Sequence, residues 1–442
     1  MSDNTVYALS TAAGKSGVAV FRVSGSDALA VVRCLTALDA GAVVPRHAYF
    51  TSLHDLAGEV LDHALVLYFK APASFTGEDT VEIHSHGSRA VIAAVLENLG
   101  RLDGFRLAEP GEFSKRAFYN GKMDLTEAEG LADLIDAETR EQQKYALRQM
   151  EGGLKNLYDG WREKLVEILA YLEAYIDFPD EELPSDLVDK LENTVFKVNG
   201  EIAAHLGQNN AGERLREGFR VVIAGEPNAG KSSLLNALAR REAVIVSDIA
   251  GTTRDVIKES VEIKGIKLNF LDTAGIRDSG YDEIEKIGIE KSRAAVKTAD
   301  VVIFLSDATV DGEKEKDLLS LLDGKKSVIA VNKSDIGKYE KDGINICAKT
   351  GENVDKLLEK VIGLLDNDGM YEKGIITNER HIAALKECVG LINDAIAAYE
   401  IMPSECIAVD IYAASSALGR ITGKSVGDDV IDEIFSRFCV GK

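Results

Sequence analysis

The sequence contains little cysteine. Its 442 residues include only five, at Cys34, Cys347, Cys388, Cys406 and Cys439. The number is odd, the residues are widely spread and no CxxC pair is present, so the pattern argues against both a disulfide framework and a zinc site. We therefore expect reduced thiols.

Long apolar runs are absent as well. No stretch approaches the roughly 20 apolar residues that cross a bilayer, and the N-terminal "MSDNTVYALS" does not follow the basic-then-apolar pattern of a secretory signal. These features predict a cytoplasmic protein without a membrane segment. With 45% hydrophobic and 28% charged residues, a chain of this length can bury the cores of about two to four domains.

Positively charged residues are fewer than negatively charged ones. The 51 Lys and Arg residues are outnumbered by 73 Asp and Glu residues, which leaves a formal net charge of −22. This charge, if spread evenly, would repel nucleic acid. An RNA partner would have to meet a local basic patch, so RNA binding must be inferred from features other than net charge.

Three types of residue pattern occur along the chain. Residues 1–118 mix short β-rich runs such as "GVAVFRVSG" with a clear helix, "SRAVIAAVLENLGRL", and predict an α+β domain. Residues 119–213 have apolar side chains at helical spacing and predict an all-α region. Residues 214–374 alternate apolar strands with amphipathic helices, which is typical of a doubly wound α/β domain, and residues 375–442 are helical again. Because domain termini usually lie close together, the α/β unit can be an insertion in one helical domain.

A phosphate-binding loop opens the α/β region. The strand "FRVVIAG" runs into "GEPNAGKSS", which fits G-x-x-x-x-G-K-[ST] from Gly225 to Ser232, and the helix "SLLNALA" follows. Gly225 and Gly230 allow backbone N–H groups to face the phosphates, and Lys231 adds a cation there. Ser232 offers its hydroxyl to Mg²⁺. The order of strand, loop and helix predicts a P-loop nucleotide site.

A second motif indicates that the nucleotide is GTP. Asn332, Lys333 and Asp335 belong to "NKSD", which follows a strand. A carboxylate such as Asp335 accepts the adjacent N1–H and N2–H₂ donors of guanine, whereas adenine would leave it unpaired. The "CAK" that begins at Cys347 stands where GTPases usually have Ser-Ala-Lys, so Cys347 departs from the usual pattern. The backbone N–H of Ala348 can still serve the base.

Two segments predict the switch regions. "LDTAG" places Asp272 at a strand end, where it can hold a Mg²⁺-bound water, and Gly275 can donate its N–H to the γ-phosphate. "GTTRD" before the next strand resembles switch I, with Thr253 as the second Mg²⁺ ligand. The full set of expected GTP contacts is Asn228, Ala229, Gly230, Lys231, Ser232, Ser233, Ser247, Asp248, Ile249, Ala250, Gly251, Thr252, Thr253, Asp272, Thr273, Ala274, Gly275, Asn332, Lys333, Ser334, Asp335, Cys347, Ala348 and Lys349.

The residue that orients the attacking water is less evident. Ras-type GTPases have glutamine directly after the glycine that corresponds to Gly275, but here the next residue is Ile276. An apolar side chain cannot orient water. Arg277, Asp278 and the carboxylates of "DEIEKIGIEK" are nearby candidates. The residues alone leave this choice open.

Taken together, the motifs resemble the MnmE (TrmE) family of tRNA-modification GTPases over essentially the whole chain. The resemblance is carried by "GKSGVAVFRVSG", "SFTGEDTVEIHSHG", "PGEFSKRAFYNGKMDLTEAEGLADLIDAET", "YIDFPDEE", "VVIAGEPNAGKSSLLNAL", "VSDIAGTTRDV", "DTAGIRDSGYDEIEKIGIEKS" and the terminal "FCVGK". Mild departures are "HSHGS", Cys347 and Val440. The resemblance implies an N-terminal tetrahydrofolate-binding domain that dimerises, a helical domain, and a Ras-like P-loop GTPase domain inserted into the helical one.

The resemblance also implies the catalytic groups of the GTPase. Glu285 in "DEIEKIG" matches the family's water-orienting glutamate. In such relatives a K⁺ ion beside the phosphates replaces an arginine finger and stabilises the charge that develops there. By the same match, the ligands of K⁺ are Asn228, Ser247, Ile249 and Thr252.

For the one-carbon chemistry, the resemblance implies 5,10-methylenetetrahydrofolate, or 5-formyltetrahydrofolate as an analogue, bound by Arg22, Glu82, Lys122 and Lys442. A pterin pairs with a carboxylate, and a glutamate tail favours cations. Without the resemblance, each residue reads as an ordinary surface charge. The family's homodimer works as a heterotetramer with the FAD-dependent partner MnmG. The pair adds a carboxymethylaminomethyl or aminomethyl group to C5 of the wobble uridine (U34) of certain tRNAs.

Three roles can be considered for Cys439, near the C-terminus. Its position is that of a prenylated cysteine, but Lys442 is a poor last residue for that signal and no polybasic stretch precedes it. The helical pattern alone favours a packed thiol. The resemblance instead implies that Cys439 lies near the folate's one-carbon unit, as a nucleophile or a polar contact.

Two other functions compete with this reading. A ribosome-assembly GTPase would carry a KH-like or strongly basic RNA-binding module, whereas the regions that flank the α/β unit are acidic. A lipidated signalling switch would have a single GTPase domain followed by a basic tail, which this sequence does not have. Both functions are therefore disfavoured.

Overall fold

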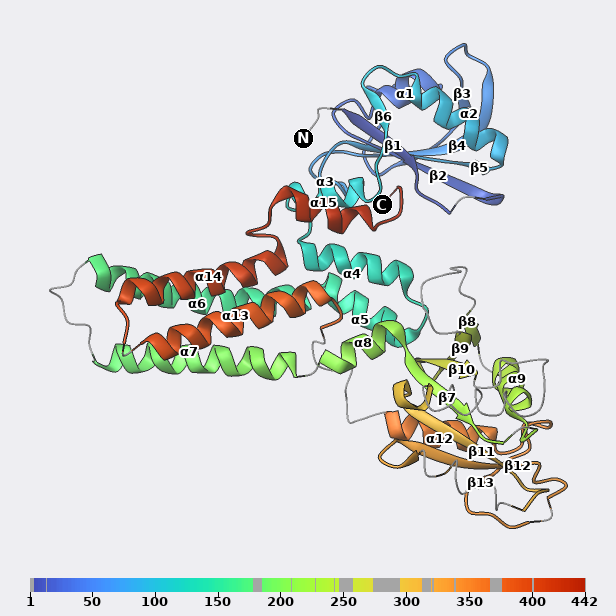
Figure 1. Cartoon of the computed structure of the whole chain (residues 1–442). Coiled ribbons are helices and arrows are strands. Elements are labelled where there is room, and N and C mark those ends of the chain that lie inside the picture. The colour runs from blue at the N-terminus through green and yellow to red at the C-terminus, as the bar shows by residue number, and fades with distance from the viewer. Residues whose placement is uncertain are drawn as a thin grey trace. The chain divides into compact units, whose positions relative to one another are not determined.

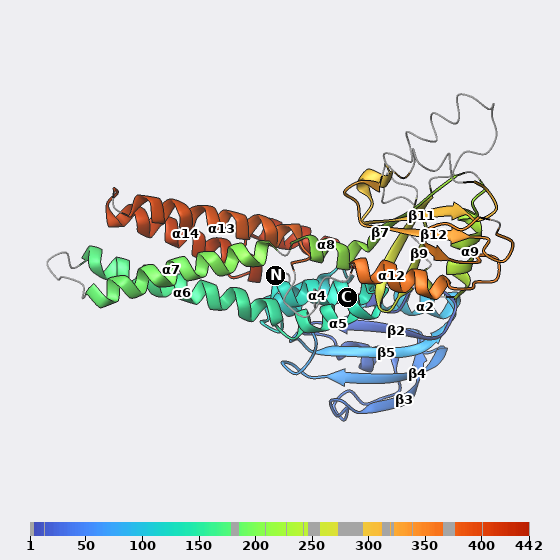
Figure 2. The same cartoon turned by 90° about the horizontal axis from the view of Figure 1, so that it is seen from below.

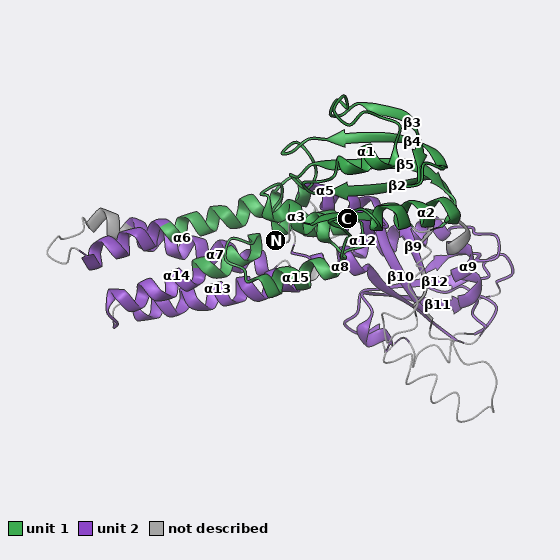
Figure 3. Ribbon diagram, turned by 90° about the horizontal axis from the view of Figure 1, so that it is seen from above, with its two compact units in different colours: residues 1–132, 149–166, 415–442 green, residues 133–148, 167–414 purple. Residues whose placement is uncertain are grey.

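The structure, a computed structural model, forms two compact units (Figure 3). One unit comprises residues 1–132, 149–166 and 415–442, and the other comprises residues 133–148 and 167–414. Each unit thus joins segments that are far apart in the sequence. The structure describes residues 4–12, 14–177, 185–207, 209–226, 228–241, 243–245, 257–272, 295–311, 319, 322–337, 339–365, 376–399 and 401–441.

A six-stranded sheet forms the N-terminal part of the first unit (Figure 1). In the order β3-β4-β5-β2-β1-β6, its strands are β3 (Ala48–His54), β4 (Val60–Phe69), β5 (Thr80–Gly87), β2 (Ser16–Ser24), β1 (Thr5–Leu9) and β6 (Phe105–Leu107). Neighbouring strands are antiparallel except β1 and β6, which are parallel. Helices α1 (Ala30–Leu35) and α2 (Arg89–Gly100) share a core with this sheet. The combination confirms the α+β prediction for the N-terminal region.

The two faces of this sheet differ in burial. In β4, Ala64, Val66 and Tyr68 point into the core that α1 and α2 complete, as the two-residue period of a strand requires. Leu65 points to the opposite face and is 41% exposed, and its cross-strand partner Phe50 is 72% exposed. The second face is therefore left open at these positions.

The rest of the first unit is helical. It contains α3 (Glu112–Tyr119), most of α4 (Leu125–Asp136), the beginning of α6 (Gly153–Asp177), the end of α14 (Ser404–Thr422) and α15 (Asp428–Ser436). Leu125 and Ala128 of α4 share a small core with Ile431 and Phe435 of α15, and Phe118 of α3 packs against it. This core joins the last helix of the chain to helices that follow the N-terminal sheet.

The helices of the second unit include α5 (Arg140–Met150), α7 (Ser185–Leu206), α8 (Asn209–Glu217) and α13 (Glu379–Ala398). In this unit, α7 and α13 lie side by side with the parts of α6 and α14 that belong to it (Figures 1 and 2). In α13, Leu385, Cys388, Ile392 and Ala395 are buried at spacings of three or four, which is the apolar stripe of a packed helix. Within the described part of the chain, no helix is long and apolar enough to span a membrane.

A seven-stranded sheet lies between α8 and α13 in the chain. Its strands, in the order β13-β12-β11-β7-β10-β9-β8, are β13 (Ile344–Asn345), β12 (Ser327–Asn332), β11 (Val301–Asp307), β7 (Phe219–Ala224), β10 (Ile266–Asp272), β9 (Ile257–Ile263) and β8 (Ala243–Ile245). The first five are parallel, so their carboxyl ends lie at one edge, and the last two pair antiparallel. Helices α9 (Lys231–Arg241) and α12 (Val354–Leu365) pack on the sheet. The predicted α/β fold inserted between helical segments is confirmed.

Candidate functional site

The phosphate-binding loop lies between the carboxyl end of β7 and the start of α9. Gly225 has a φ of 146° and Gly230 a φ of 98°, which are conformations that favour glycine. A Cβ atom on Gly225 would lie only 2.2 Å from the carbonyl oxygen of Leu305. Asn228 has a φ of 64°, in the left-handed region that asparagine tolerates better than most residues. The curled loop that the motif predicts is therefore present.

Lys231 and Ser232 begin α9. The side chain of Lys231 folds over the loop, and its Nζ donates hydrogen bonds to the carbonyl oxygens of Gly225 at 2.8 Å and Glu226 at 2.9 Å. Its charge is thereby held beside the loop backbone. Ser232 and Ser233 are exposed in the first turn of the helix. A serine hydroxyl is an oxygen donor of the kind that Mg²⁺ binds, and a helix N-terminus favours phosphate, so these residues fit a Mg²⁺–nucleotide.

Asn332, at the end of β12, connects the phosphate loop to the predicted base site. Its Nδ2 donates to the carbonyl oxygen of Ala229 at 2.8 Å, and its Oδ1 accepts from the backbone N–H of Ala348 at 2.9 Å. Ser334 Oγ donates to the carbonyl oxygen of Ile346 at 2.9 Å. Asn332 is only 3% exposed, and a buried amide is costly unless its groups are bonded. The three motif segments are therefore fixed against one another by buried hydrogen bonds.

Lys333 is held by a residue that the sequence interpretation missed. Asp307 ends β11, and its Oδ2 lies 2.6 Å from Lys333 Nζ. Its Oδ1 accepts from the N–H of Thr309 at 2.8 Å and from the Oγ1 of Thr309 at 2.7 Å. Burial by itself would raise the pKa of Asp307, but the bonds from Lys333 and Thr309 outweigh it and hold the pKa below its usual value. The carboxylate that ends the apolar run "ADVVIFLSD" is the signal by which this residue could have been found.

The remaining base-site residues differ in exposure. Asp335 and Lys349 are exposed, so the Asp335 carboxylate is open to a ligand. Cys347 is 1% exposed, and its backbone N–H donates to the carbonyl oxygen of Glu352 at 3.1 Å. Its side chain therefore packs inside the protein, and the N–H of Ala348 is already bonded to Asn332.

The other expected GTP contacts lie outside the described residues. Of Asp272, the last residue of β10, only the backbone is described, and it pairs with Ile223 of β7. This places Asp272 at the same sheet edge as the phosphate loop. The expected contacts outside the described residues are Ser247, Asp248, Ile249, Ala250, Gly251, Thr252, Thr253, Thr273, Ala274 and Gly275, together with Glu285 and the alternative candidates Arg277 and Asp278.

In the first unit, Arg22 and Glu82 form an ion pair on the face of the sheet opposite the core that α1 and α2 complete. They are register partners on β2 and β5, and Arg22 Nε and Nη2 lie 3.0 and 2.9 Å from Glu82 Oε1. The guanidinium carbon of Arg22 lies 5.2 Å from the ring centroid of Phe75 and 5.7 Å from that of Phe113. His84 Nε2 lies 3.4 Å from Glu82 Oε2. Two aromatic rings and a carboxylate thus fix the direction in which the arginine presents its N–H groups.

Lys122 lies between α3 and α4, and its side chain contacts the segment that connects β4 to β5. Its Nζ donates to the carbonyl oxygen of Pro72 at 3.0 Å, and Phe75 of the same segment contacts Arg22. This segment therefore contacts both Lys122 and Arg22, and Arg22 is paired with Glu82. The fourth, Lys442, lies outside the described part of the chain.

The C-terminal tail runs along the N-terminal sheet. Val440 forms an antiparallel bridge with Pro110, and the carbonyl oxygen of Cys439 accepts from the N–H of Gly111 at 3.3 Å. Ser10 Oγ donates to the carbonyl oxygen of Gly441 at 3.0 Å. Gly441 has a φ of 94°, and a Cβ atom there would lie 2.4 Å from the Leu9 carbonyl oxygen, so only glycine fits this close approach.

This docking corrects one reading of Cys439. The residue follows α15 and is exposed, so the thiol is not packed in a helix core as the helical pattern alone favours. Strand β1, whose end contacts Gly441, pairs with β2 so that Ala8 lies opposite Arg22. The tail therefore lies at the strand next to the one that carries Arg22.

Comparison with known proteins covers nearly the whole chain. The family model described as the MnmE helical domain matches residues 125–439, and the model described as the GTP-binding protein TrmE N-terminus matches residues 5–122. A protein of Parvibaculum lavamentivorans named tRNA modification GTPase MnmE is 48% identical over 442 residues, which cover 99% of this chain and 100% of that protein. A protein of Orientia tsutsugamushi with the same name is 43% identical over 100% of both chains.

A solved structure of Era from Aquifex aeolicus, in complex with GDP and AlF4−, is 26% identical and covers 39% of this chain and 66% of its own. Its TM-score of 0.27 is too low for conclusions about the fold. The full-length identities and the two family models are sufficient to assign the family. This chain belongs to the MnmE family of tRNA modification GTPases.

Proposed function

We propose that this chain is a K⁺-activated GTPase that acts with the FAD-dependent protein MnmG on certain tRNAs. The pair adds a carboxymethylaminomethyl or aminomethyl group to C5 of the wobble uridine U34. The one-carbon unit comes from 5,10-methylenetetrahydrofolate. The observation that carries the proposal is that one chain combines a guanine-type nucleotide site with a second charged site, Arg22–Glu82, at a docked C-terminal tail.

The nucleotide site supports GTP for a chemical reason. The exposed Asp335 carboxylate offers two acceptor oxygens, which match the adjacent N–H donors of guanine. Lys333 beside it is held by Asp307, so the segment has little freedom to adapt to another base. In the proposal, Ser232 and Thr253 hold Mg²⁺, which neutralises charge on the β- and γ-phosphates. Glu285 orients the attacking water.

The proposed K⁺ site includes Asn228, an exposed residue of the phosphate loop with a left-handed backbone. Its other ligands in the proposal are Ser247, Ile249 and Thr252. A monovalent cation at this point stabilises the charge that develops between the β- and γ-phosphates, as an arginine finger does elsewhere.

GTP hydrolysis is therefore expected to be faster in potassium chloride than in sodium chloride, as the GTPase domains of two subunits pair. The measurement is steady-state phosphate release at matched ionic strength in the two salts. Basal nucleotide affinity, measured in the same two buffers, serves as the control. Equal hydrolysis rates would count against the K⁺ site.

The second site has the charges that a tetrahydrofolate requires. Glu82 can pair with the N–H groups of a pterin, and the cations Arg22, Lys122 and Lys442 suit the glutamate tail. The docked tail holds the exposed Cys439 on the same sheet, where the thiol can reach the one-carbon unit as a nucleophile or as a polar contact.

The proposal includes a homodimer that binds MnmG in a heterotetramer. The open sheet face, with Phe50 at 72% exposure and Leu65 at 41%, supports dimerisation through the N-terminal domain, because exposed apolar side chains on one face mark interaction surfaces. The domain limits that we propose are 1–118, 119–213, 214–374 and 375–442. We place the protein in the cytoplasm, where its tRNA substrates are.

The proposed function is tested by nucleoside analysis of tRNA from cells that lack this protein. We expect the wobble-uridine modification to disappear and to return when the wild-type gene is restored. A strain that lacks MnmG is the matched comparison and should lose the same nucleoside. Unaltered wobble uridines in cells without this protein would contradict the proposed function.

A further inference from the structure

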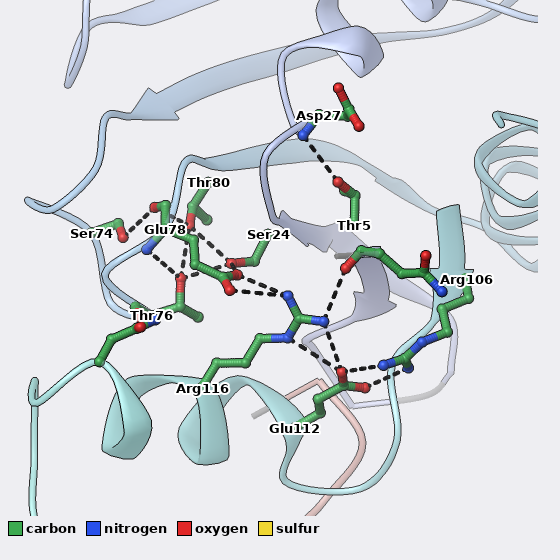
Figure 4. Close-up of polar contacts among 12 residues, drawn as sticks. Thr5, Ser24, Asp27, Ser74, Thr76, Glu78, Thr80, Arg106, Glu112 and Arg116 are labelled. Atoms are coloured by element: carbon green, nitrogen blue, oxygen red, sulfur yellow. Dashed lines mark hydrogen bonds and ion pairs between the residues drawn. The ribbon is translucent and has the colours of Figure 1, made fainter. Parts of the chain in front are cut away.

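The segment that carries Phe75 is held by a cluster of charged side chains. It connects β4 to β5 and contains Ser74, Thr76 and Glu78 (Figure 4). Ser74 Oγ donates to the backbone carbonyl oxygen of Glu78 at 2.5 Å, and Thr76 Oγ1 accepts from the Glu78 N–H at 3.2 Å. Asn120 Nδ2 donates to the Thr76 carbonyl oxygen at 2.7 Å. The segment is thus a tightly bonded turn.

Arg116 of α3 is the central anchor of this turn. Its Nη1 donates to both carboxylate oxygens of Glu78, at 3.1 and 3.0 Å, and Glu78 Oε2 also accepts from Ser24 Oγ at 2.8 Å. The Arg116 side chain is 7% exposed. Ser24 and Arg22 belong to the same strand, β2. The arginine therefore holds the Phe75 turn against the strand that carries Arg22.

Arg116 is itself fixed by further partners. Its Nε and Nη2 lie 3.2 and 2.9 Å from Glu112 Oε1, and Nη2 also donates to the Asn4 carbonyl oxygen at 3.0 Å. On its other side, Glu112 accepts from Arg106 at 2.7 and 2.6 Å. Burial would raise the pKa of Glu112, but the bonds from Arg106, the Glu109 N–H and Arg116 hold it below its usual value.

The four charged side chains form a neutral cluster of two arginines and two glutamates. Arg116 and Glu112 are buried and their partners are partly exposed, and such ion pairs add little net stability, because the cost of removing charges from water offsets their attraction. Apolar side chains of the same volume would hold α3 against the sheet at least as well. What the charges add is direction, because the arginine fork accepts only one placement of each carboxylate. The cluster therefore defines one position of the turn.

We propose that Arg116 is a positioning residue for the folate site. It holds Glu78, which holds the turn, and the turn places Phe75 against the guanidinium of Arg22. This inference rests on the proposed function, since Arg22 is a ligand contact only if the site binds folate. Loss of the Arg116–Glu78 bonds leaves Glu78 held by Ser24 alone among its side-chain partners here, so the turn can shift and Phe75 no longer orients Arg22.

The test compares Arg116→Met with Arg106→Met in the full-length protein. Arg106 contacts Glu112 but has no bond to Glu78 in the described contacts, so it is the matched control. The readout is the Kd for 5-formyltetrahydrofolate by isothermal titration calorimetry, with Tm and GTP hydrolysis measured alongside. We expect Arg116→Met to raise the Kd by about 10- to 100-fold, the range for a misplaced binding group, and Arg106→Met to affect mainly Tm. GTP hydrolysis should stay unchanged in both.

A double-mutant cycle separates positioning from a general loss of structure. Phe75→Leu removes the ring that Arg116 is proposed to place, so its effect on the Kd should not add to that of Arg116→Met. Arg116→Lys keeps a charge without the fork and serves if the methionine variant does not fold; it should also raise the Kd. Wild-type affinity in a folded Arg116 variant, or additive effects in the cycle, would overturn the positioning role. If the wild-type protein does not bind 5-formyltetrahydrofolate, the proposed folate site is wrong, and so is the role of Arg116 in it.

Discussion

Replacing Glu285 with alanine is expected to abolish GTP hydrolysis while sparing GTP binding. A carboxylate that orients the attacking water contributes about 10²- to 10⁴-fold to the rate, and Ile276 cannot replace it because an apolar side chain does not bond water. Binding should persist because the described bonds of Asn332, which connect the phosphate loop to the base site, are made with Ala229 and Ala348. The measurements are single-turnover hydrolysis at saturating GTP and the Kd of a fluorescent GTP analogue.

The neighbouring carboxylate Glu283 provides a matched control for this prediction. Both residues belong to the run "DEIEKIG", so Glu283→Ala removes the same charge from the same segment. We expect the Glu283 variant to hydrolyse GTP at the wild-type rate. Wild-type turnover by the Glu285 variant would instead favour Arg277, Asp278 or another carboxylate of "DEIEKIGIEK".

Replacing Cys439 with serine is expected to abolish tRNA modification while GTP hydrolysis continues. The thiol is exposed in the tail beside the N-terminal sheet, and a serine hydroxyl is similar in size but a much weaker nucleophile at neutral pH. The docking bonds of the tail come from backbone atoms of Cys439 and Gly441, so the substitution should leave the tail in place. Modified nucleosides in tRNA from complemented cells and phosphate release by the purified variant are the two readouts.

Cys34 is the control for this substitution, because it is also exposed and lies in the same unit. Cys34→Ser should retain both activities. A contrasting thiol is Cys388, for which burial raises the pKa to about 12, so it stays protonated and unreactive. Retained modification in the Cys439 variant would exclude a nucleophilic role and leave at most a polar contact that serine reproduces.

The nucleotide site could be predicted from the sequence because each of its motifs lies within a short stretch of the chain. A strand, a turn and a helix start follow one another within a few residues, so "GEPNAGKSS", "NKSD" and "CAK" each carry their own structural context. Parallel strands bring their carboxyl ends to one edge, which is where the structure has Asn332 and the phosphate loop in contact. Asp307 obeys the same rule and was overlooked only because it stands outside a named motif.

The site that contains Arg22 and Glu82 could not be predicted from the residues alone. Arg22 and Glu82 are 60 positions apart, and each resembles an ordinary surface charge until the register of β2 and β5 sets them opposite each other. Glu78 and Arg116 are 38 positions apart, and their bond depends on how α3 packs against the turn. Only the resemblance to a family identified Arg22 and Glu82 beforehand, and neither pattern nor resemblance identified Arg116.

The sequence by itself determined the fold class, the GTP specificity of the motifs and the family, because these depend on periodicity and on residues close together in the chain. The tertiary structure alone decided that Cys439 is exposed instead of packed, that the tail docks on Gly111 and Ser10, and that a cluster of charged side chains holds the turn beside Arg22. The physical reason is that these contacts join segments whose approach is set by sheet register and core packing. Neither of these leaves a pattern in a short stretch of sequence.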